Sequence, residues 1–324
     1  MTPAVFLKLL AIFAVVTIGW LAGRAKFFGG GETARALSNA AFYLFAPALL
    51  FRTTARIDFA TLPWAVIVAY FVPVVGLLLG IYVWRRRQGR LAEGSPAEPS
   101  VRAITATFSN TVQLGIPIAL ALFGEAGLSI HLAIVSLHAL ILLSLLTVLV
   151  ELDLARAASR TEAGRPRLAA TLKLTVRNTL IHPVVLPVLV GMGWNVAGLP
   201  IPSAADEILS MLGQAVVPVC LVAIGMSLAH YGLAGSLRGA GWLTAAKLVA
   251  QPALVLAVGH FVFGLSGLPL TVIVMCAALP SGTNALMFSQ RYRSQEAETT
   301  ATLVLSTLVF VLTAPLWLAL VSRL

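Results

Sequence analysis

Long apolar runs alternate with short polar connections along the whole chain. We recognise ten such runs, at residues 3–23, 34–53, 62–84, 103–123, 128–150, 173–193, 205–229, 239–263, 269–290 and 297–321. An α-helix rises about 1.5 Å per residue, so about 20 residues cross the roughly 30 Å hydrocarbon core of a bilayer. The pattern therefore predicts an all-α integral membrane protein with ten transmembrane helices.

The composition strengthens this prediction and argues against other classes of protein. Hydrophobic residues make up 59% and charged residues 10% of the 324 positions, which is far from the composition of a soluble domain. The cysteines, Cys220 and Cys276, fall inside predicted spans, so no disulfide framework is expected. The sequence lacks metalloprotease, serine-hydrolase and phosphate-loop motifs, and it has no paired cysteines with metal-ligand spacing. We therefore expect no enzymatic activity, no cofactor and no metal site.

The formal net charge of +10 follows the membrane topology. If the N-terminus lies outside, most basic residues fall on cytoplasmic connections, and external positions hold only Lys8, Arg52, Arg56 and Arg323. Such a bias is the positive-inside rule, and it accounts for the charge without a nucleic-acid partner. We expect a multi-pass membrane protein with both termini outside.

The polar stretch at 151–171 divides the chain into two halves, 1–150 and 172–324, with five predicted spans each. An odd number of spans per half places the second half upside down relative to the first, as in the inverted repeats of many secondary carriers. A mid-helix proline recurs in the second span of each half, as Pro47 and Pro218. The sequence thus predicts two inverted five-helix repeats joined by a cytoplasmic linker.

Helix-breaking polar clusters interrupt the fourth span of each half. Proline removes an amide donor, and the freed backbone groups survive in a membrane only where protein or a wet cavity satisfies them. A broken helix also places a half-helix N-terminus in mid-membrane, where its amides suit a carboxylate. The alternative is a pair of plain proline kinks with polar side chains bonded to neighbouring helices. The candidate substrate-binding residues here are Asn110, Thr111, Gln113, Gly115 and Pro117 in the first cluster and Pro280, Ser281, Gly282, Thr283 and Asn284 in the second.

Two ionisable residues inside predicted spans are further candidates, because charge in hydrocarbon is costly and usually functional. Lys247 lies within the span at 239–263. It either attracts an anionic substrate, or it is paired structurally or extends its ammonium toward the membrane surface. His138 lies within the span at 128–150, where it either lines the pocket or is a buried neutral imidazole bonded to a neighbour.

The stretch Asn110-Thr111-Val112-Gln113-Leu114-Gly115-Ile116-Pro117, followed by Leu122-Phe123-Gly124, resembles the fourth span of the auxin efflux carrier family. This family includes plant auxin exporters and bacterial proteins described as malonate or malate permeases. Further similar stretches are 42–51, 217–229, 247–252 and 279–292. The long cytosolic loop of many plant members is absent, which favours a short bacterial type of carrier. A second difference is that Arg177-Asn178-Thr179 stands where the family often has Asn-Pro.

The resemblance implies a secondary transporter of small organic anions, either auxin-like monocarboxylates or malonate-like dicarboxylates. It implies a scaffold of spans one, two, six and seven, a homodimer through spans two and seven, and a transport domain of the other spans that moves as an elevator. Asn110, Pro117 and Pro280 would be crossover residues, and His138 falls where plant members have a pocket glutamine. The alternatives are a sodium-coupled symporter of the bile-acid type, although no carboxylate lies nearer the crossover than Glu125, and a channel.

Overall fold

The computed structural model describes residues 3–26, 31–56, 64–89, 95–158, 185–231 and 237–324. These residues are almost entirely helical, and their only strand-like pairing is one isolated bridge. In chain order the elements are α1 (Pro3–Arg24), α2 (Gly31–Ala40), η1 (Ala41–Phe45), α3 (Ala46–Thr54), α4 (Trp64–Gly89), α5 (Glu98–Thr107), η3 (Thr111–Gly115), α6 (Ile116–Ala158), α8 (Val185–Val196), α9 (Ser203–Tyr231), α10 (Leu237–Ala245), η4 (Ala246–Ala250), α11 (Gln251–Ala257), η5 (Val258–Val262), α12 (Gly267–Ala278), α13 (Thr283–Arg291) and α14 (Glu296–Val321).

Five stretches of the described chain are long and apolar enough to cross a membrane, which agrees with the predicted helical membrane protein. They are Trp64–Gln88, Thr111–Leu154, Ser203–Met226, Arg238–Val262 and Glu296–Val321. The expected span at 3–23 corresponds to the helix α1, Pro3–Arg24, whereas the expected spans at 34–53 and 269–290 are interrupted helices. Most of the expected linker at 151–171 and the first part of the expected span at 173–193 lie outside the described residues.

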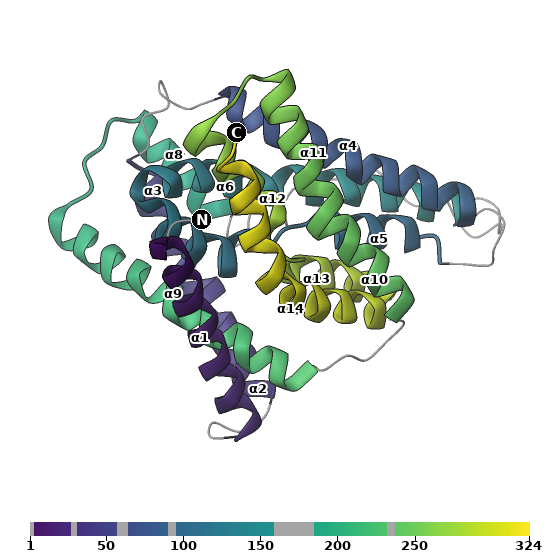
Figure 1. Cartoon of the computed structure of the whole chain (residues 1–324), viewed down its shortest axis with the longest axis horizontal. Helices are drawn as coiled ribbons and strands as arrows, with labels where there is room; N and C mark the ends of the chain where they lie inside the picture. Colours follow the sequence, from purple (N-terminus) through teal and green to yellow (C-terminus); the bar gives the residue numbers. More distant parts are fainter. Residues whose placement is uncertain (1–2, 27–30, 57–63, 90–94, 159–184, 232–236) are drawn as a thin grey trace.

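Two groups of helices are distinguished by their packing (Figure 1). In one group α1, α2 and α3 pack along α9, and α8 packs against α3. In the other group α4, α5 and α10 to α14 pack together, while α6 contacts both groups. The contact between α1 and α9 is close because glycines face it. A Cβ atom on Gly19 or Gly225 would collide with backbone atoms of the opposite helix, so a larger residue at either position would force these two helices apart.

The π-helical turns η1, η3 and η4 each end two residues before a proline, at Pro47, Pro117 and Pro252. A proline clashes with the carbonyl four residues earlier and offers it no N–H, so the helix must widen and that carbonyl needs another donor. The carbonyl of Leu248, four residues before Pro252, receives it from another helix, because the Trp317 indole N–H donates to that oxygen at 2.8 Å. The proline in this helix is therefore stabilised by α14.

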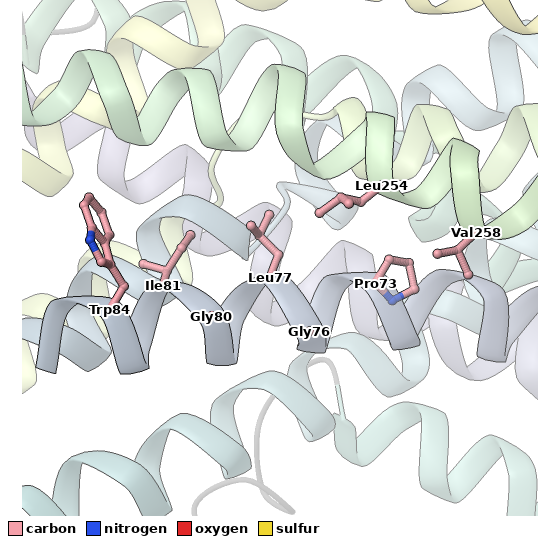
Figure 2. A pocket seen from close by; sticks show the side chains of 8 residues that line it. All are labelled: Pro73, Gly76, Leu77, Gly80, Ile81, Trp84, Leu254 and Val258. Carbon is pink, nitrogen blue, oxygen red and sulfur yellow. The ribbon is translucent and has the colours of Figure 1, made fainter. Parts of the chain in front are cut away.

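Gly76 and Gly80 lie four residues apart on α4, a spacing typical of close helix contacts. A Cβ atom on either glycine would meet no atom within 4 Å. The glycines instead open onto an apolar groove of about 520 Å³ between α4 and the helix α11–η5 (Figure 2). The groove is lined by Pro73, Gly76, Leu77, Gly80, Ile81, Trp84, Leu254 and Val258.

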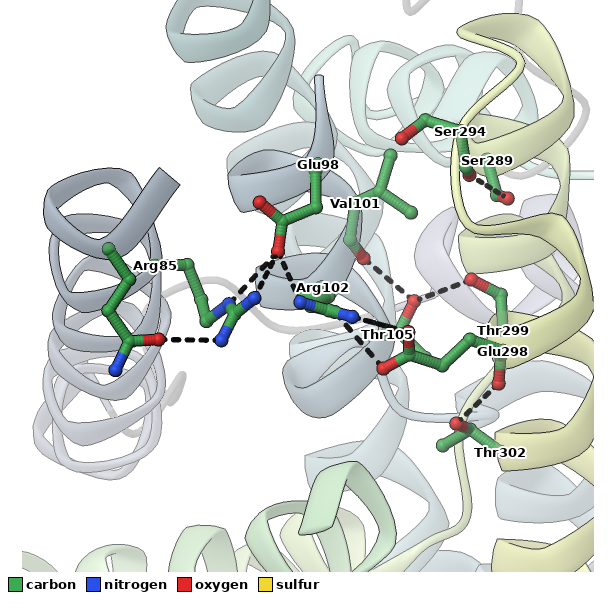
Figure 3. Close-up of polar contacts among 11 residues, drawn as sticks. Arg85, Glu98, Val101, Arg102, Thr105, Ser289, Ser294, Glu298, Thr299 and Thr302 are labelled. Carbon is green, nitrogen blue, oxygen red and sulfur yellow. Dashed lines mark hydrogen bonds and ion pairs between the residues drawn. The ribbon is translucent and has the colours of Figure 1, made fainter. Parts of the chain in front are cut away.

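An ion-pair network joins α4, α5 and α14 at the N-terminal ends of α5 and α14 (Figure 3). Glu98 accepts hydrogen bonds from Arg85 at 2.6 Å and from Arg102, and Arg102 also pairs with Glu298 at 2.7 Å. Both carboxylates are buried. Arg85 and Arg102 are among the basic residues for which the charge pattern of the sequence indicated only a topological role. In the structure they link helices of one group.

Candidate functional site

The two helix-breaking clusters lie against each other in the structure. Ser109 and Ser281 form an antiparallel bridge. The Asn110 N–H donates to the Pro280 carbonyl at 2.8 Å, and the Gly282 N–H donates to the Phe108 carbonyl at 2.8 Å. Two extended segments, 108–110 and 279–282, thus satisfy each other's backbone groups inside an otherwise helical protein. We call this paired region the crossover.

Each broken helix has a first half that ends at the crossover and a second half that begins there. The first halves, α5 and α12, end at Thr107 and Ala278, and the second halves begin at Thr111 and Thr283. The first amides of a helix and its last carbonyls have no partner within the helix. The second halves therefore direct N–H groups without helical partners and positive dipole ends to this region, whereas the first halves direct carbonyls there.

A small cavity lies beside the crossover, and its volume of about 20 Å³ corresponds to roughly one water molecule. Six of the predicted site residues line it, together with Phe108, Ser109, Val112, Val135 and Ala139; the six are Asn110, Thr111, Gln113, Gly282, Thr283 and Asn284. All of the lining residues are uncharged. Their amides and hydroxyls can donate hydrogen bonds to a carboxylate without the repulsion that an acidic neighbour would add.

The other six predicted site residues do not line this cavity. They are Gly115, Pro117, His138, Lys247, Pro280 and Ser281. Ser281 is part of the bridge itself, and its hydroxyl donates to the Thr105 carbonyl at 2.7 Å while its N–H donates to the Ser306 hydroxyl at 3.1 Å. The structure therefore brings this residue to the crossover as part of its framework.

His138 lies behind the crossover, where it is fully buried and contacts the ring of Phe108 at a centroid distance of 4.6 Å. Its Nε2 accepts a hydrogen bond from the Ser109 N–H at 3.2 Å, and its Nδ1 lies 3.3 Å from the Tyr70 hydroxyl. Because Nε2 accepts, the proton of the neutral ring is on Nδ1. The imidazole thus holds one backbone amide of the bridge.

Gly115 is required by close packing, because a Cβ atom there would lie 2.6 Å from Nε2 of His131. That nitrogen lies 2.8 Å from the Thr111 carbonyl, which can only accept, so Nε2 of His131 is the donor. His131, to which sequence analysis gave no site role, therefore satisfies a carbonyl in the first turn of the second half-helix.

Lys247 and Gln251 approach the crossover from η4 and α11. The Lys247 ammonium donates to the Ala277 carbonyl at 2.6 Å, and the Gln251 amide donates to the Thr107 carbonyl at 3.1 Å. Sequence reasoning missed Gln251, although a polar residue one turn after an intramembrane lysine and directly before Pro252 was a usable signal. Both side chains cap first half-helices at their C-terminal ends.

The comparisons with known proteins agree with a transport role. The family described as "Membrane transport protein" matches residues 4–318. The chain is 27% identical to "Uncharacterized transporter YfdV" of Escherichia coli over 324 residues, covering 98% of this chain and 97% of the relative. It is 26% identical to a Rhizobium meliloti protein named "Putative malonate transporter" over 314 residues, covering 94% and 92% of the two chains.

A plant relative is also found, at lower coverage. "Auxin efflux carrier component 8" of Arabidopsis thaliana is 25% identical over 261 residues, which cover 68% of this chain and 70% of the relative. The relatives are named as transporters or carriers and not as enzymes. Because the family match extends over nearly the whole length, the chain belongs to the membrane transport protein family that includes the auxin efflux carriers.

Proposed function

We propose that this protein is a secondary transporter that binds a small organic carboxylate in the cavity beside the crossover. The observation that carries the proposal is the hydrogen-bonded pairing of two broken helices next to a cavity lined by uncharged donors. Asn110, Gln113, Thr283 and Asn284 would donate side-chain hydrogen bonds to the carboxylate. Backbone amides at the starts of η3 and α13 would add donors and positive dipole ends.

The proposed substrate is a malonate- or malate-like dicarboxylate or an auxin-like monocarboxylate. The names of the Rhizobium and Arabidopsis relatives support this class, since both malonate and auxin are small carboxylates. A cavity of about 20 Å³ has no room for such a molecule, so binding requires the surrounding helices to separate. We therefore place substrate entry in a second conformation of the same site.

The proposed movement is an elevator displacement of one helix group against the other. The first group, α1 to α3, α8 and α9, would be the scaffold, and α4 to α6 and α10 to α14 would move with the substrate. In this proposal the two groups would derive from ten spans in two inverted repeats, with spans one, two, six and seven in the scaffold. A homodimer through the second and seventh spans, as the family resemblance implies, would place exposed residues such as Tyr43 of η1 and Met211 of α9 at or near the interface.

The experiment that tests the proposed function is a thermal-shift screen of the purified protein against malonate, malate, lactate and indole-acetate. A ligand that binds only the folded state raises the melting temperature, by an amount equivalent to about 2.7 kcal/mol at a concentration of 100 Kd. We expect at least one carboxylate to raise it, and the matching fully methylated ester to have no effect because it lacks the charge. If all four acids leave the melting temperature unchanged, the proposal fails.

We also propose that the protein lies in the bacterial inner membrane with both termini outside. A cysteine at Ser203 should then react with an impermeant thiol reagent in intact cells, whereas a cysteine at Arg87 should react only after the cells are opened. The native Cys220 and Cys276 are buried and provide a low background. The reverse labelling pattern would invert the proposed orientation.

A further inference from the structure

Lys247 is the most deeply buried charged residue among the described residues, with an exposed fraction of 0%. A lysine inside a membrane protein costs several kcal/mol unless its ammonium has partners. Its described hydrogen-bond partner is the Ala277 carbonyl at 2.6 Å. That carbonyl belongs to the last turn of α12, where carbonyls lack helical partners and the dipole end is negative. The ammonium therefore compensates the C-terminal end of one first half-helix.

Gln251 repeats this contact on the other broken helix. It lies one helical turn after Lys247, and its amide donates to the carbonyl of Thr107, the last residue of α5. A single helix thus caps both first half-helices immediately before they enter the Ser109–Ser281 bridge. The Oε1 atom of Gln251 is buried and has no hydrogen-bond partner among the described residues. Within the described part of the chain, the Gln251 Oε1 atom is therefore an unpaired acceptor near the C-terminal ends of α5 and α12, where backbone carbonyls also point.

Oxygen atoms of this kind have a known use in carriers with discontinuous helices. Unwound carbonyls and the C-terminal ends of half-helices coordinate the coupling cation in such proteins. In this chain the Ala277 carbonyl, at the C-terminal end of α12, accepts a hydrogen bond from the ammonium of the protein's own Lys247. No acidic residue lines the neighbouring cavity, so the usual carboxylate ligand of a sodium site is not supplied from there.

We propose that the Lys247 ammonium is a built-in cation that holds the crossover together, because it binds a half-helix carbonyl of the kind that coordinates the coupling cation in other carriers with broken helices. The inference rests on the proposed transport function and deepens it. It makes Lys247 a positioning residue that acts through Ala277 on the geometry of the cavity, and it predicts transport without sodium. It also accounts for a lysine that lies beside the site and yet does not line the cavity.

Replacement of the side chain by a free amine tests the proposal. Lys247→Ala removes the atoms of a propylammonium ion, so added propylammonium has space to restore the contact with Ala277. Lys247→Met is the matched control, because it removes the charge but fills the space. We expect Lys247→Ala to melt at a lower temperature than wild type, and propylammonium to raise its melting temperature without affecting wild type or Lys247→Met.

Transport in proteoliposomes provides the second measurement, with malonate as the probe. Loss of a hydrogen bond from a charged group is expected to lower the initial rate of both variants by about tenfold or more. Propylammonium should raise the rate of Lys247→Ala at least severalfold and leave the lowered rate of Lys247→Met unchanged. Wild-type transport should be the same in sodium and in choline buffer.

The inference is overturned if Lys247→Ala transports at the wild-type rate, if propylammonium changes neither its melting temperature nor its rate, or if wild-type transport stops without sodium. A failure of the transport function has a different signature. In that case no carboxylate binds to or is moved by the wild type, while the melting temperature of Lys247→Ala still rises with propylammonium.

Discussion

Alanine at Asn110 or Asn284 is expected to lower carboxylate transport by about tenfold to a hundredfold, because each substitution removes a donor to a charged ligand. Both side chains line the cavity. The Asn110 N–H donates to the Pro280 carbonyl across the crossover, and the Asn110 carbonyl accepts from the Gly115 N–H, and alanine retains both bonds. We therefore expect the melting temperature to stay within a few degrees of wild type. Binding of a carboxylate by thermal shift and initial rates in proteoliposomes would measure the effect.

The control for this pair is Asn195→Ala. Asn195 lies on α8 and does not line the cavity. Its amide donates to the Ala55 carbonyl at 2.9 Å, so alanine removes a contact between helices of the first group. We expect this variant to melt at a lower temperature and to bind carboxylates with unchanged affinity. Normal transport by both Asn110→Ala and Asn284→Ala would reduce the two breaks to structural kinks and leave the substrate site unassigned.

Methionine at Arg102 is expected to have the largest effect on stability. The Arg102 side chain is 16% exposed and lies between Glu98 and Glu298, whose side chains are 8% and 5% exposed (Figure 3). Breaking a buried ion pair on one side costs about 3–5 kcal/mol, because the remaining charge is left in a poorly solvated place. Glu298 would lose its guanidinium, and α5 would lose its ionic link to α14. A large fall in melting temperature in detergent is the expected result.

Arg87→Met provides the comparison, since it removes the same charge from an exposed position on α4. An exposed charge contributes at most about 1 kcal/mol, so this variant should melt close to wild type. Equal melting temperatures for the two variants would show that the network in Figure 3 does not stabilise the protein. A double substitution, Arg102→Met with Glu298→Gln, should recover part of the loss because it also removes the stranded carboxylate.

Much of this architecture can be predicted from the sequence, because a bilayer imposes simple demands on a chain. Helices must be long and apolar to cross it, and the stretches Trp64–Gln88, Ser203–Met226 and Glu296–Val321 follow the predicted spans within a few residues. A helix can break in hydrocarbon only where its backbone is satisfied. The clusters around Asn110 and Ser281 were therefore recognisable from the sequence as helix breaks that need backbone partners, and the structure brings them into contact.

The directions and the hydrogen-bond partners of the polar side chains depended on the packing of helices that are far apart along the chain. Periodicity places Lys247 on one face of a helix, but it does not indicate whether that face meets a substrate, lipid or a carbonyl of another helix. The same uncertainty applied to Arg102, which had the appearance of a topological charge in the sequence and pairs with Glu298, 196 positions away. Trp317 and the Leu248 carbonyl are likewise joined only after two helices have packed. Hydrophobic patterning specifies which segments leave water, whereas the pairing of their few polar groups is settled by which helices come within hydrogen-bonding distance.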